Sequence, residues 1–305
     1  MVNECYFRIR CKITTFSRHV QEKSANICVC EKKAVYLHPK LQRRHKEMKR
    51  IIIILCAAAL VSCAGRHAQE ARQVGAVVRD TINGVPCQVY VPHGSLVIGD
   101  RSLVSGDRAL VIGVRYPVLY LQHGMFGNEN DWVEQGHLVH WMDSLLRIDA
   151  VKEMVVVMPD NCPSRPTYEE EKDNATTGEW EAHFAEFMAD TERKYPVRSD
   201  AAGRAIAGLS MGGYHTMRVA ATYPGQFAYV GMFSPATFVH EAPTGARVFW
   251  IGIGNEDFLF ESLQEYRAWL DASHIEYTYY ESTGGHTWPN WQDYICRFLP
   301  KLFKE

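Results

Sequence analysis

Strand-like apolar runs alternate with amphipathic stretches from residue 116 to the end of the chain. The runs that predict short buried strands are Tyr116–Leu121, Met154–Met158, Arg204–Ala207, Val248–Gly254 and Glu276–Glu281. Apolar residues at helical spacing predict helices at 132–146, 179–194 and 214–221. Because strands that alternate with helices form a mainly parallel central sheet flanked by helices, we expect an α/β fold in a single domain.

Two shorter patterns precede this alternation, and a polar stretch interrupts it. Ala76–Asp80 and Val85–Val91 flank Asn83-Gly84, which is the signal of two strands joined by a tight turn. Residues 96–115 repeat a seven-residue pattern three times. So short a period does not build a solenoid, and we expect a locally extended insertion or hairpin there. The polar residues 161–178 predict a mobile loop over or beside a cleft.

The start of the chain does not show this alternation of strands and helices. Residues 1–47 show neither strand nor helix periodicity and run into a second methionine, Met48. We expect them to be a disordered upstream extension that is not part of the native protein. From Met48, two basic residues precede the apolar run Ile51–Val61, which is too short to span a membrane and is typical of a bacterial export signal. Residues 48–62 are therefore predicted to be a signal peptide.

Cys63 follows this apolar run. The sequence Leu60-Val61-Ser62-Cys63 resembles the lipobox of bacterial lipoproteins. The resemblance implies that Cys63 is acylated and becomes the mature N-terminus, with residues 63–75 as a polar tether and residues 76–305 as the folded domain. We therefore expect a lipid-anchored protein of the bacterial cell envelope, in the periplasm or at the outer membrane. The alternative is a cleaved secretory peptide without lipid, which would give a secreted protein.

Charge and cysteine content narrow the function classes. Residues 1–50 carry 13 Lys and Arg against 4 Asp and Glu, which leaves 20 basic and 31 acidic side chains in the rest of the chain. Nucleic-acid binding needs a clustered basic surface, so the acidic body argues against such a partner. Cys28 and Cys30 lack the spacing and the second pair of a zinc site, and no metal is predicted. Whether any two of Cys87, Cys162 and Cys296 pair stays open at this point.

The stretch Gly208-Leu209-Ser210-Met211-Gly212 joins a predicted strand to a predicted helix. We interpret it as a nucleophile elbow, the sharp turn that exposes a serine in the pattern G-x-S-x-G. Glycines two residues before and after Ser210 let the strand and the helix pass closely. The turn also directs the N–H of Met211 at negative charge that develops beside Ser210 Oγ. A chance turn is the alternative.

A triad built on such an elbow needs an acid and then a histidine later in the chain, each just after a strand. The run Val248–Gly254 ends at Glu256 and Asp257, and the run Glu276–Glu281 leads to Gly284-Gly285-His286. Both requirements are met, with Glu256 and Asp257 as the two candidate acids. A surface histidine without a catalytic role is the alternative for His286.

The turn after the strand Tyr116–Leu121 contains His123-Gly124-Met125. In architectures with an elbow, a glycine-bearing turn after an early strand supplies the second oxyanion donor. We assign this donor to the N–H of Met125, with an ordinary turn as the alternative. His123 and His215 lie near the same site by sequence, and we predict that both are structural.

Four motifs together resemble the esterases of the α/β-hydrolase superfamily, most closely the acetylxylan and feruloyl esterases of carbohydrate esterase family one and more distantly the S-formylglutathione hydrolases. These motifs lie at 116–127, 204–213, 250–259 and 284–288. The resemblance covers roughly residues 80–303 and implies the α/β-hydrolase fold. It also implies a triad of Ser210, Asp257 and His286, because the family motif places its acid at the position of Asp257.

The resemblance implies a serine esterase that removes acetyl or feruloyl groups from carbohydrate or small-molecule esters through an acyl-enzyme. No cofactor is implied, because the triad supplies the nucleophile, the base and the electrostatic stabilisation. The alternatives are an acyltransferase or thioesterase with the same triad, and a lipid-anchored binding protein without activity. Trp132, Trp288 and Trp291 are expected to form cleft walls, with core packing as the alternative for each.

Overall fold

The computed structural model describes residues 75–92, 97–98, 101–102, 115–161 and 177–304 of the 305-residue chain. All of them belong to one compact unit, Gly65–Glu305. Several predictions concern residues outside the described ones: the upstream extension 1–47, the signal peptide 48–62, Cys63 with the tether as far as residue 74, and most of the polar loop 161–178. Gly75, the last residue of the predicted tether, is the first residue of a strand.

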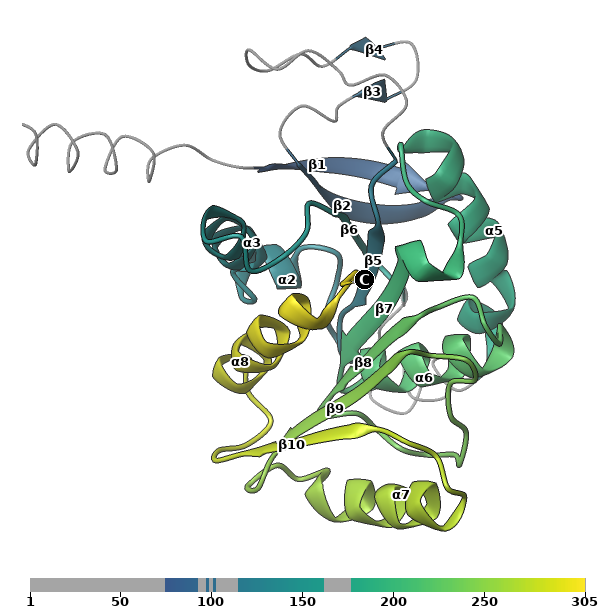
Figure 1. Cartoon of the computed structure of the whole chain (residues 1–305), viewed down its shortest axis with the longest axis vertical. Coiled ribbons are helices and arrows are strands. Elements are labelled where there is room, and N and C mark those ends of the chain that lie inside the picture. Colours follow the sequence, from purple (N-terminus) through teal and green to yellow (C-terminus); the bar gives the residue numbers. More distant parts are fainter. Residues whose placement is uncertain (1–74, 93–96, 99–100, 103–114, 162–176, 305) are drawn as a thin grey trace, which may run out of the picture. The chain divides into compact units, whose positions relative to one another are not determined.

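An eight-stranded sheet forms the centre of this unit, in the order β1-β2-β6-β5-β7-β8-β9-β10 (Figure 1). Its strands are β1 (Gly75–Ile82), β2 (Val85–Pro92), β5 (Val118–Gln122), β6 (Val155–Pro159), β7 (Arg204–Leu209), β8 (Tyr229–Phe233), β9 (Val248–Gly254) and β10 (Thr278–Ser282). The β1–β2 and β2–β6 pairs are antiparallel, and all other neighbours in the sheet are parallel. The prediction of a mainly parallel sheet is confirmed.

A two-stranded hairpin lies within the predicted insertion 96–115. Its strands, β3 (Val97–Ile98) and β4 (Arg101–Ser102), pair antiparallel. The hairpin falls in the first of the three seven-residue repeats, and most of the second and third repeats lies outside the described residues.

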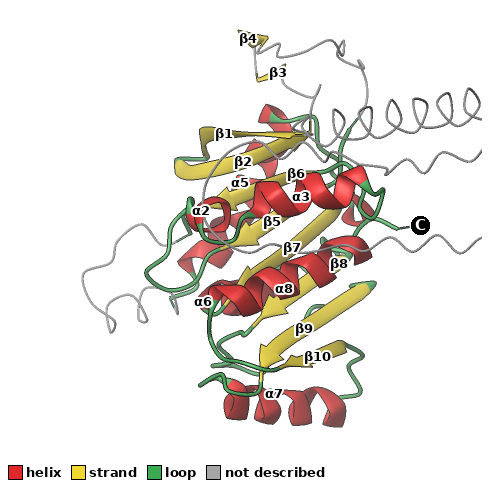
Figure 2. Cartoon of the chain, turned by 90° about the vertical axis from the view of Figure 1, so that its left-hand side faces the viewer, coloured by secondary structure: helices red, strands yellow, loops and turns green. Residues whose placement is uncertain are grey.

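Helices cover both faces of the sheet (Figures 1 and 2). One face carries α2 (Asp131–Glu134), α3 (Leu138–Arg147) and α8 (Trp288–Phe298), followed by the short 3₁₀ turn η2 (Leu299–Lys301). The other carries α5 (Glu179–Lys194), α6 (Met211–Thr222) and α7 (Phe260–Ala272), and the 3₁₀ turn η1 (Ala201–Gly203) precedes β7. None of the described helices is long and apolar enough to cross a bilayer.

Strand β5 shows how the sheet divides the core into two layers. All five of its residues are buried. Val118 and Tyr120 belong to the cluster under α5, α6 and α7, whereas Leu119 and Leu121 belong to the cluster under α3 and α8. This alternation follows from the period of two in a strand, and full burial on both faces explains why the run reads as continuously apolar.

The predicted single helix at 132–146 is wrong, because the structure has α2 and α3 with a break between them. A Cβ atom at Gly136 would lie 2.6 Å from the indole ring of Trp132, so the chain passes this ring only with a glycine. The next residue, His137, is in the left-handed region with φ of 51°. The apolar spacing continues across the break, which is why the pattern alone favoured one helix.

The carboxyl ends of the parallel strands gather the loops that carry the predicted site. Ser210 directly follows β7, Asp257 comes three residues after β9, and His286 comes four residues after β10. The turn with Met125 follows β5, which pairs with β7. Ligands of open α/β sheets bind outside the carboxyl ends of the strands, so the topology brings these loops to the expected edge.

Candidate active site

Ser210 stands on a strained turn between β7 and α6. Its φ of 55° and ψ of −118° lie outside the common regions for a residue with a side chain. A Cβ atom at Gly208 would lie 2.4 Å from the carbonyl oxygen of Gly212, and one at Gly212 would lie 2.3 Å from the carbonyl oxygen of His123. Both glycines are therefore required for the strand and the helix to approach, and the predicted strand-to-helix turn is confirmed.

Ser210, His286 and Asp257 form one hydrogen-bonded chain. His286 Nε2 lies 2.9 Å from Ser210 Oγ, and His286 Nδ1 lies 3.0 and 2.9 Å from the two carboxylate oxygens of Asp257. A carboxylate only accepts, so Nδ1 carries a proton and Nε2 is free to accept one from Ser210. The side chain of Glu256 is exposed, and none of the described hydrogen bonds of His286 involves it.

The carboxylate of Asp257 is buried and stays ionised. Burial alone would raise the pKa of this carboxyl, but hydrogen bonds from His286 and from the backbone N–H of Leu259 outweigh it, and the pKa lies below its usual value. The Leu259 N–H donates to Asp257 Oδ1 at 2.9 Å. An anion held in this way orients the imidazole and stabilises positive charge on it.

The two loops that carry Asp257 and His286 are joined through their backbones. The N–H of Asn255 donates to the carbonyl of Ser282 at 2.9 Å, and the N–H of Glu256 donates to the carbonyl of Gly284 at 3.0 Å. A Cβ atom at Gly254 would lie 2.0 Å from the carbonyl oxygen of Gly284. The glycine at the end of β9 thus allows the contact that fixes the acid relative to the histidine.

Two backbone N–H groups beside Ser210 have no acceptor among the described residues. Met211 is the first residue of α6, and Met125 lies in the turn after β5. Both residues line the cleft of Ser210, and within the described part of the chain neither N–H donates a hydrogen bond. A Cβ atom at Gly124 would lie 3.3 Å from Ser210 Cβ, which places the peptide of Met125 next to the serine. The pair fits the predicted oxyanion donors.

The cleft around Ser210 has a volume of about 460 Å³ and aromatic walls. Three of the aromatic side chains that line it are strongly exposed: Phe258 by 75%, Phe126 by 55% and Phe238 by 45%. The Phe258 ring lies 4.5 Å from the imidazole of His286. Exposed apolar side chains gathered at one cleft indicate a ligand site rather than core packing.

Two of the three tryptophans predicted to line the cleft do line it. Trp288 and Trp291 line the cleft, together with the polar side chains of Asp131 and Gln135. The prediction for Trp132 is wrong: its side chain is 1% exposed, packs edge-on behind Trp288 at 5.4 Å and donates to the carbonyl of Gln122 at 3.0 Å. Trp132 therefore supports the wall from inside the core.

Sequence reasoning missed the three exposed phenylalanines as cleft residues. Phe126 follows the predicted oxyanion donor and Phe258 follows the predicted acid, so their position beside site residues was an available signal. Phe238 lies in the short segment between β8 and β9, where no periodic pattern exists, and its neighbours in sequence carry no chemistry that would single it out.

Both histidines predicted to be structural are buried. His215 Nδ1 lies 2.7 Å from Glu181 Oε1 and links α6 to α5. His123 lies at the oxyanion turn, with Nδ1 at 2.7 Å from the carbonyl oxygen of Gly124 and Nε2 at 3.2 Å from the backbone N of Asn161.

Neither of the two described cysteines forms a disulfide. Cys87 and Cys296 are free. Burial raises the pKa of each to about 12, so neither forms a thiolate near neutral pH. Cys162 lies outside the described residues. Neither Cys87 nor Cys296 is among the described residues that line the cleft of Ser210.

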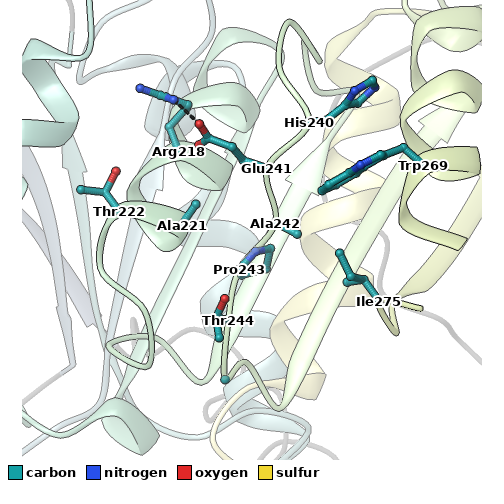
Figure 3. Close-up of a pocket in the computed structure, with 11 residues that line it drawn as sticks. Arg218, Ala221, Thr222, His240, Glu241, Ala242, Pro243, Thr244, Trp269 and Ile275 are labelled. Carbon is teal, nitrogen blue, oxygen red and sulfur yellow. Dashed lines mark hydrogen bonds and ion pairs between the residues drawn. The ribbon is translucent and has the colours of Figure 1, made fainter. Parts of the chain in front are cut away.

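A larger cavity of about 700 Å³ lies between α6, α7 and residues 240–245 (Figure 3). There the ring of His240 stacks on Trp269 at 5.2 Å, and Arg218 pairs with Glu241. Neither serine nor cysteine is among the described residues that line it, and it contains none of the predicted site residues. The hydrogen-bonded pair Ser210 and His286 lines the smaller cleft instead, which is therefore the candidate active site.

Known proteins resemble the chain in sequence. The family model described as "Putative esterase" matches residues 112–277. An endo-1,4-beta-xylanase/feruloyl esterase of Xylanibacter ruminicola is 32% identical over 147 residues, which cover 47% of this chain and 20% of that protein. An acetyl esterase of Caldicellulosiruptor saccharolyticus is 24% identical over 236 residues, which cover 61% of this chain and 83% of that protein. The chain thus spans only about a fifth of the first of these relatives.

Solved structures resemble the chain in fold. A CE1 ferulic acid esterase from Anaeromyces mucronatus, in complex with ferulic acid, superposes with a TM-score of 0.62 at 20% identity. The superposition covers 77% of this chain and 93% of that one. This likeness, with the sheet order and the helices on both faces, shows the α/β-hydrolase fold that the sequence resemblance implied.

Proposed function

Because this chain belongs to the esterase family, we propose that it hydrolyses carboxylic esters with Ser210 as nucleophile, His286 as general base and acid, and Asp257 as the orienting anion. The observation that carries the proposal is the hydrogen-bonded chain from Ser210 Oγ through His286 to the buried Asp257, with distances of 2.9 to 3.0 Å. Nucleophile and base within hydrogen-bond reach, with the base held by a third group, is the arrangement that activates a serine.

In the first half of the reaction, Ser210 Oγ attacks the carbonyl carbon of the ester while His286 Nε2 accepts the hydroxyl proton. The carbonyl electron pair moves to oxygen and gives a tetrahedral oxyanion. When the oxyanion collapses, the bond to the alcohol breaks, and His286 returns the proton to the leaving oxygen. The products are a free alcohol and an acyl group on Ser210.

The second half repeats these steps with water. His286 Nε2 accepts a proton as the water oxygen attacks the acyl carbon, and the second oxyanion collapses with Ser210 as the leaving group. The proton returns to Ser210 Oγ and the carboxylic acid departs. Throughout, Asp257 stays ionised because its pKa is low, so it can balance the positive charge on the imidazole.

Each oxyanion in this scheme accepts from the N–H groups of Met125 and Met211. Preorganised backbone donors are effective because they cost no reorganisation when charge develops, and removal of one such donor raises the barrier by about 2.7 to 4 kcal/mol. Two features support this role: the absence of another acceptor for either N–H among the described residues, and the contact of Gly124 with Ser210.

The residues that line the cleft support the proposal that the substrate is an ester of a feruloyl or acetyl group. Phe126, Phe238 and Phe258 offer aromatic faces to a flat acyl chain, and Asp131 with Gln135 offers hydrogen-bond partners for a hydroxyl group. The names of the two relatives, a xylanase/feruloyl esterase and an acetyl esterase, point the same way. We propose that the alcohol part is a carbohydrate or another small alcohol.

A hydrolysis panel tests this proposal on the full chain: methyl ferulate, acetylated xylan, 4-nitrophenyl acetate and S-formylglutathione, each with the Ser210→Ala variant as the blank. The expected result is hydrolysis of the oxygen esters that the variant lacks. A clear preference for S-formylglutathione would favour a thioesterase. Faster acyl transfer to an added alcohol than to water would favour an acyltransferase, and no turnover of any substrate would contradict the proposal.

A further inference from the structure

The peptide between Gly124 and Met125 is the unit that presents one of the two oxyanion donors. A trans peptide is planar, and its C=O and N–H point in opposite directions. No cis peptide bond occurs among the described residues. The direction of the Gly124 carbonyl therefore determines the direction of the Met125 N–H, and whatever holds the carbonyl also aims the donor.

Two donors hold this carbonyl. His123 Nδ1 lies 2.7 Å from the Gly124 oxygen, and the N–H of Gly127 donates to the same oxygen at 3.1 Å. Because a carbonyl oxygen only accepts, Nδ1 must carry a proton. The other ring nitrogen, Nε2, accepts from the backbone N–H of Asn161 at 3.2 Å.

The site of this contact is closed to water. The side chain of His123 is 2% exposed, and Asp160 Oδ1 lies 3.3 Å from Nε2 on its far side. A buried hydrogen bond has no competing water, and its orientation is correspondingly well defined. The ring is thus fixed between the loop that follows β6 and the oxyanion turn.

The turn itself is built around the imidazole. A Cβ atom at Gly127 would lie 2.9 Å from His123 Nδ1 and 2.3 Å from Asp131 Oδ2, so only glycine lets the chain return this closely to the ring. Phe126 has a φ of 60°, in the left-handed region that aromatic residues rarely adopt. A turn that contains such a residue needs contacts that hold it, because the backbone does not favour it.

We infer that His123 is a positioning residue for the oxyanion hole: its Nδ1–H bond to the Gly124 carbonyl aims the Met125 N–H at the oxyanion formed on Ser210. The inference rests on the proposed function and extends it to a side chain that touches neither substrate nor triad. Without this bond, Gly124, which has no side chain to restrict it, can rotate its peptide and turn the donor away.

Two substitutions at His123 distinguish the donor role of Nδ1 from the acceptor role of Nε2. In His123→Asn, the amide nitrogen is bonded to Cγ as Nδ1 is, so it can still donate to Gly124 but leaves the N–H of Asn161 without its acceptor. In His123→Gln, the amide reaches the position of Nε2 and can accept from Asn161, but the donor to Gly124 is lost. A buried N–H without a partner is costly, so the Asn variant should be the less stable of the two.

The expected kinetic order is the reverse of the expected stability order. His123→Gln should lower kcat by about 10- to 1000-fold, up to the effect of losing one oxyanion donor, with KM within about 3-fold of wild type. His123→Asn should keep kcat within about 5-fold. Binding of a trifluoromethyl ketone, which forms an oxyanion on the serine, should weaken in parallel with kcat. A role in packing alone predicts that activity follows thermal stability, and that result would overturn the inference.

If a variant does not fold, a measurement on the wild-type enzyme can still test the inference. Nitrogen NMR of the His123 ring should show a protonated Nδ1, and an unprotonated Nδ1 would overturn the inference, since it could not donate to the Gly124 carbonyl. Failure of the inference is distinguishable from failure of the proposed function. An inactive Ser210→Ala beside a fully active His123→Gln rejects only the role of His123, whereas an active Ser210→Ala rejects the function.

Discussion

The imidazole of His286 is held by both carboxylate oxygens of Asp257, with Nδ1 at 3.0 and 2.9 Å from them. The neighbouring carboxylate of Glu256 is exposed and takes no part in the described hydrogen bonds of this ring. One of two adjacent acids is thus selected by the loop geometry after β9, and the selection can be tested by substituting each acid in turn.

Asp257→Asn should lower kcat by about four orders of magnitude near neutral pH, because an amide can hold the wrong tautomer of His286 and cannot balance its positive charge. Glu256→Gln is the matched control and should keep kcat within about 2-fold. Steady-state kinetics with 4-nitrophenyl acetate provide the measurement. If the Gln variant were the impaired one, the acid of the triad would be Glu256.

Phe258→Ala should weaken the binding of aromatic acyl groups. This side chain is 75% exposed and lines the cleft 4.5 Å from the His286 ring, so we expect it to contact the acyl group of a feruloyl ester. An aromatic contact contributes about 0.5 to 1.5 kcal/mol, which predicts a roughly 2- to 12-fold higher KM for methyl ferulate and little change for an acetyl ester. Ile148→Ala, at an exposed residue that does not line the cleft, is the control. Equal effects on both esters would remove Phe258 from the acyl site.

Gly212→Ala should impair stability and activity together. The added methyl group would lie 2.3 Å from the carbonyl oxygen of His123 and 2.7 Å from that of Gln122, and both are backbone atoms that cannot move independently. Overpacking of this kind costs about 1 to 3 kcal/mol, or roughly 2–12 °C in Tm for a domain of this size.

The control for this prediction is Gly225→Ala. Gly225 has a φ of 72° and no heavy atom near the position of a Cβ, so the substitution costs about 1–2 kcal/mol of backbone strain and should leave kcat unchanged. Thermal unfolding and kinetics of both variants provide the comparison. A Gly212→Ala enzyme with wild-type kcat would show that the elbow and the oxyanion turn need not pack so closely.

The sequence was sufficient to predict the parts of the site that depend on local pattern. The elbow at Ser210, the strand Val248–Gly254 and the helix at 179–194 have the predicted type and nearly the predicted bounds, because each has a clear period and a glycine or proline at its end. The choice between Asp257 and Glu256 did not follow from the residues alone, since both lie after the same strand, and it depended on the family resemblance.

The parts that the sequence could not supply depend on tertiary contacts. The break at Gly136 arises because the Trp132 ring folds back on the chain, and the same burial removes Trp132 from the cleft wall. The exposed Phe238 lies in an irregular segment without a periodic signal. The contact of His123 with Gly124 joins adjacent residues, but its geometry depends on the loop after β6, which is distant in sequence.

A prediction about location concerns Cys63. We propose that translation starts at Met48 and that Cys63 is lipidated, because Lys49-Arg50, the apolar run Ile51–Val61 and the lipobox-like sequence occur in the required order. Each buried CH₂ group of an acyl chain adds about 0.8 kcal/mol of membrane affinity. Cys63→Ser should therefore give a soluble, active esterase or an unprocessed precursor in place of a membrane-bound protein. Mass spectrometry of the membrane fraction identifies the N-terminus, and an unmodified one upstream of Met48 would contradict the proposal.

The central claim is that Ser210 is the nucleophile, and the turnover of Ser210→Ala tests it most directly. Ser262→Ala is the matched control, since Ser262 donates to the carbonyl of the cleft residue Leu259 at 3.0 Å and has no role in the mechanism. Loss of a triad nucleophile lowers kcat by about a millionfold. We predict that purified Ser210→Ala, folded as judged by its thermal unfolding, has no hydrolysis above the uncatalysed rate with methyl ferulate or 4-nitrophenyl acetate, whereas Ser262→Ala retains wild-type kcat. A folded Ser210→Ala enzyme that kept a tenth of the wild-type kcat would contradict the claim.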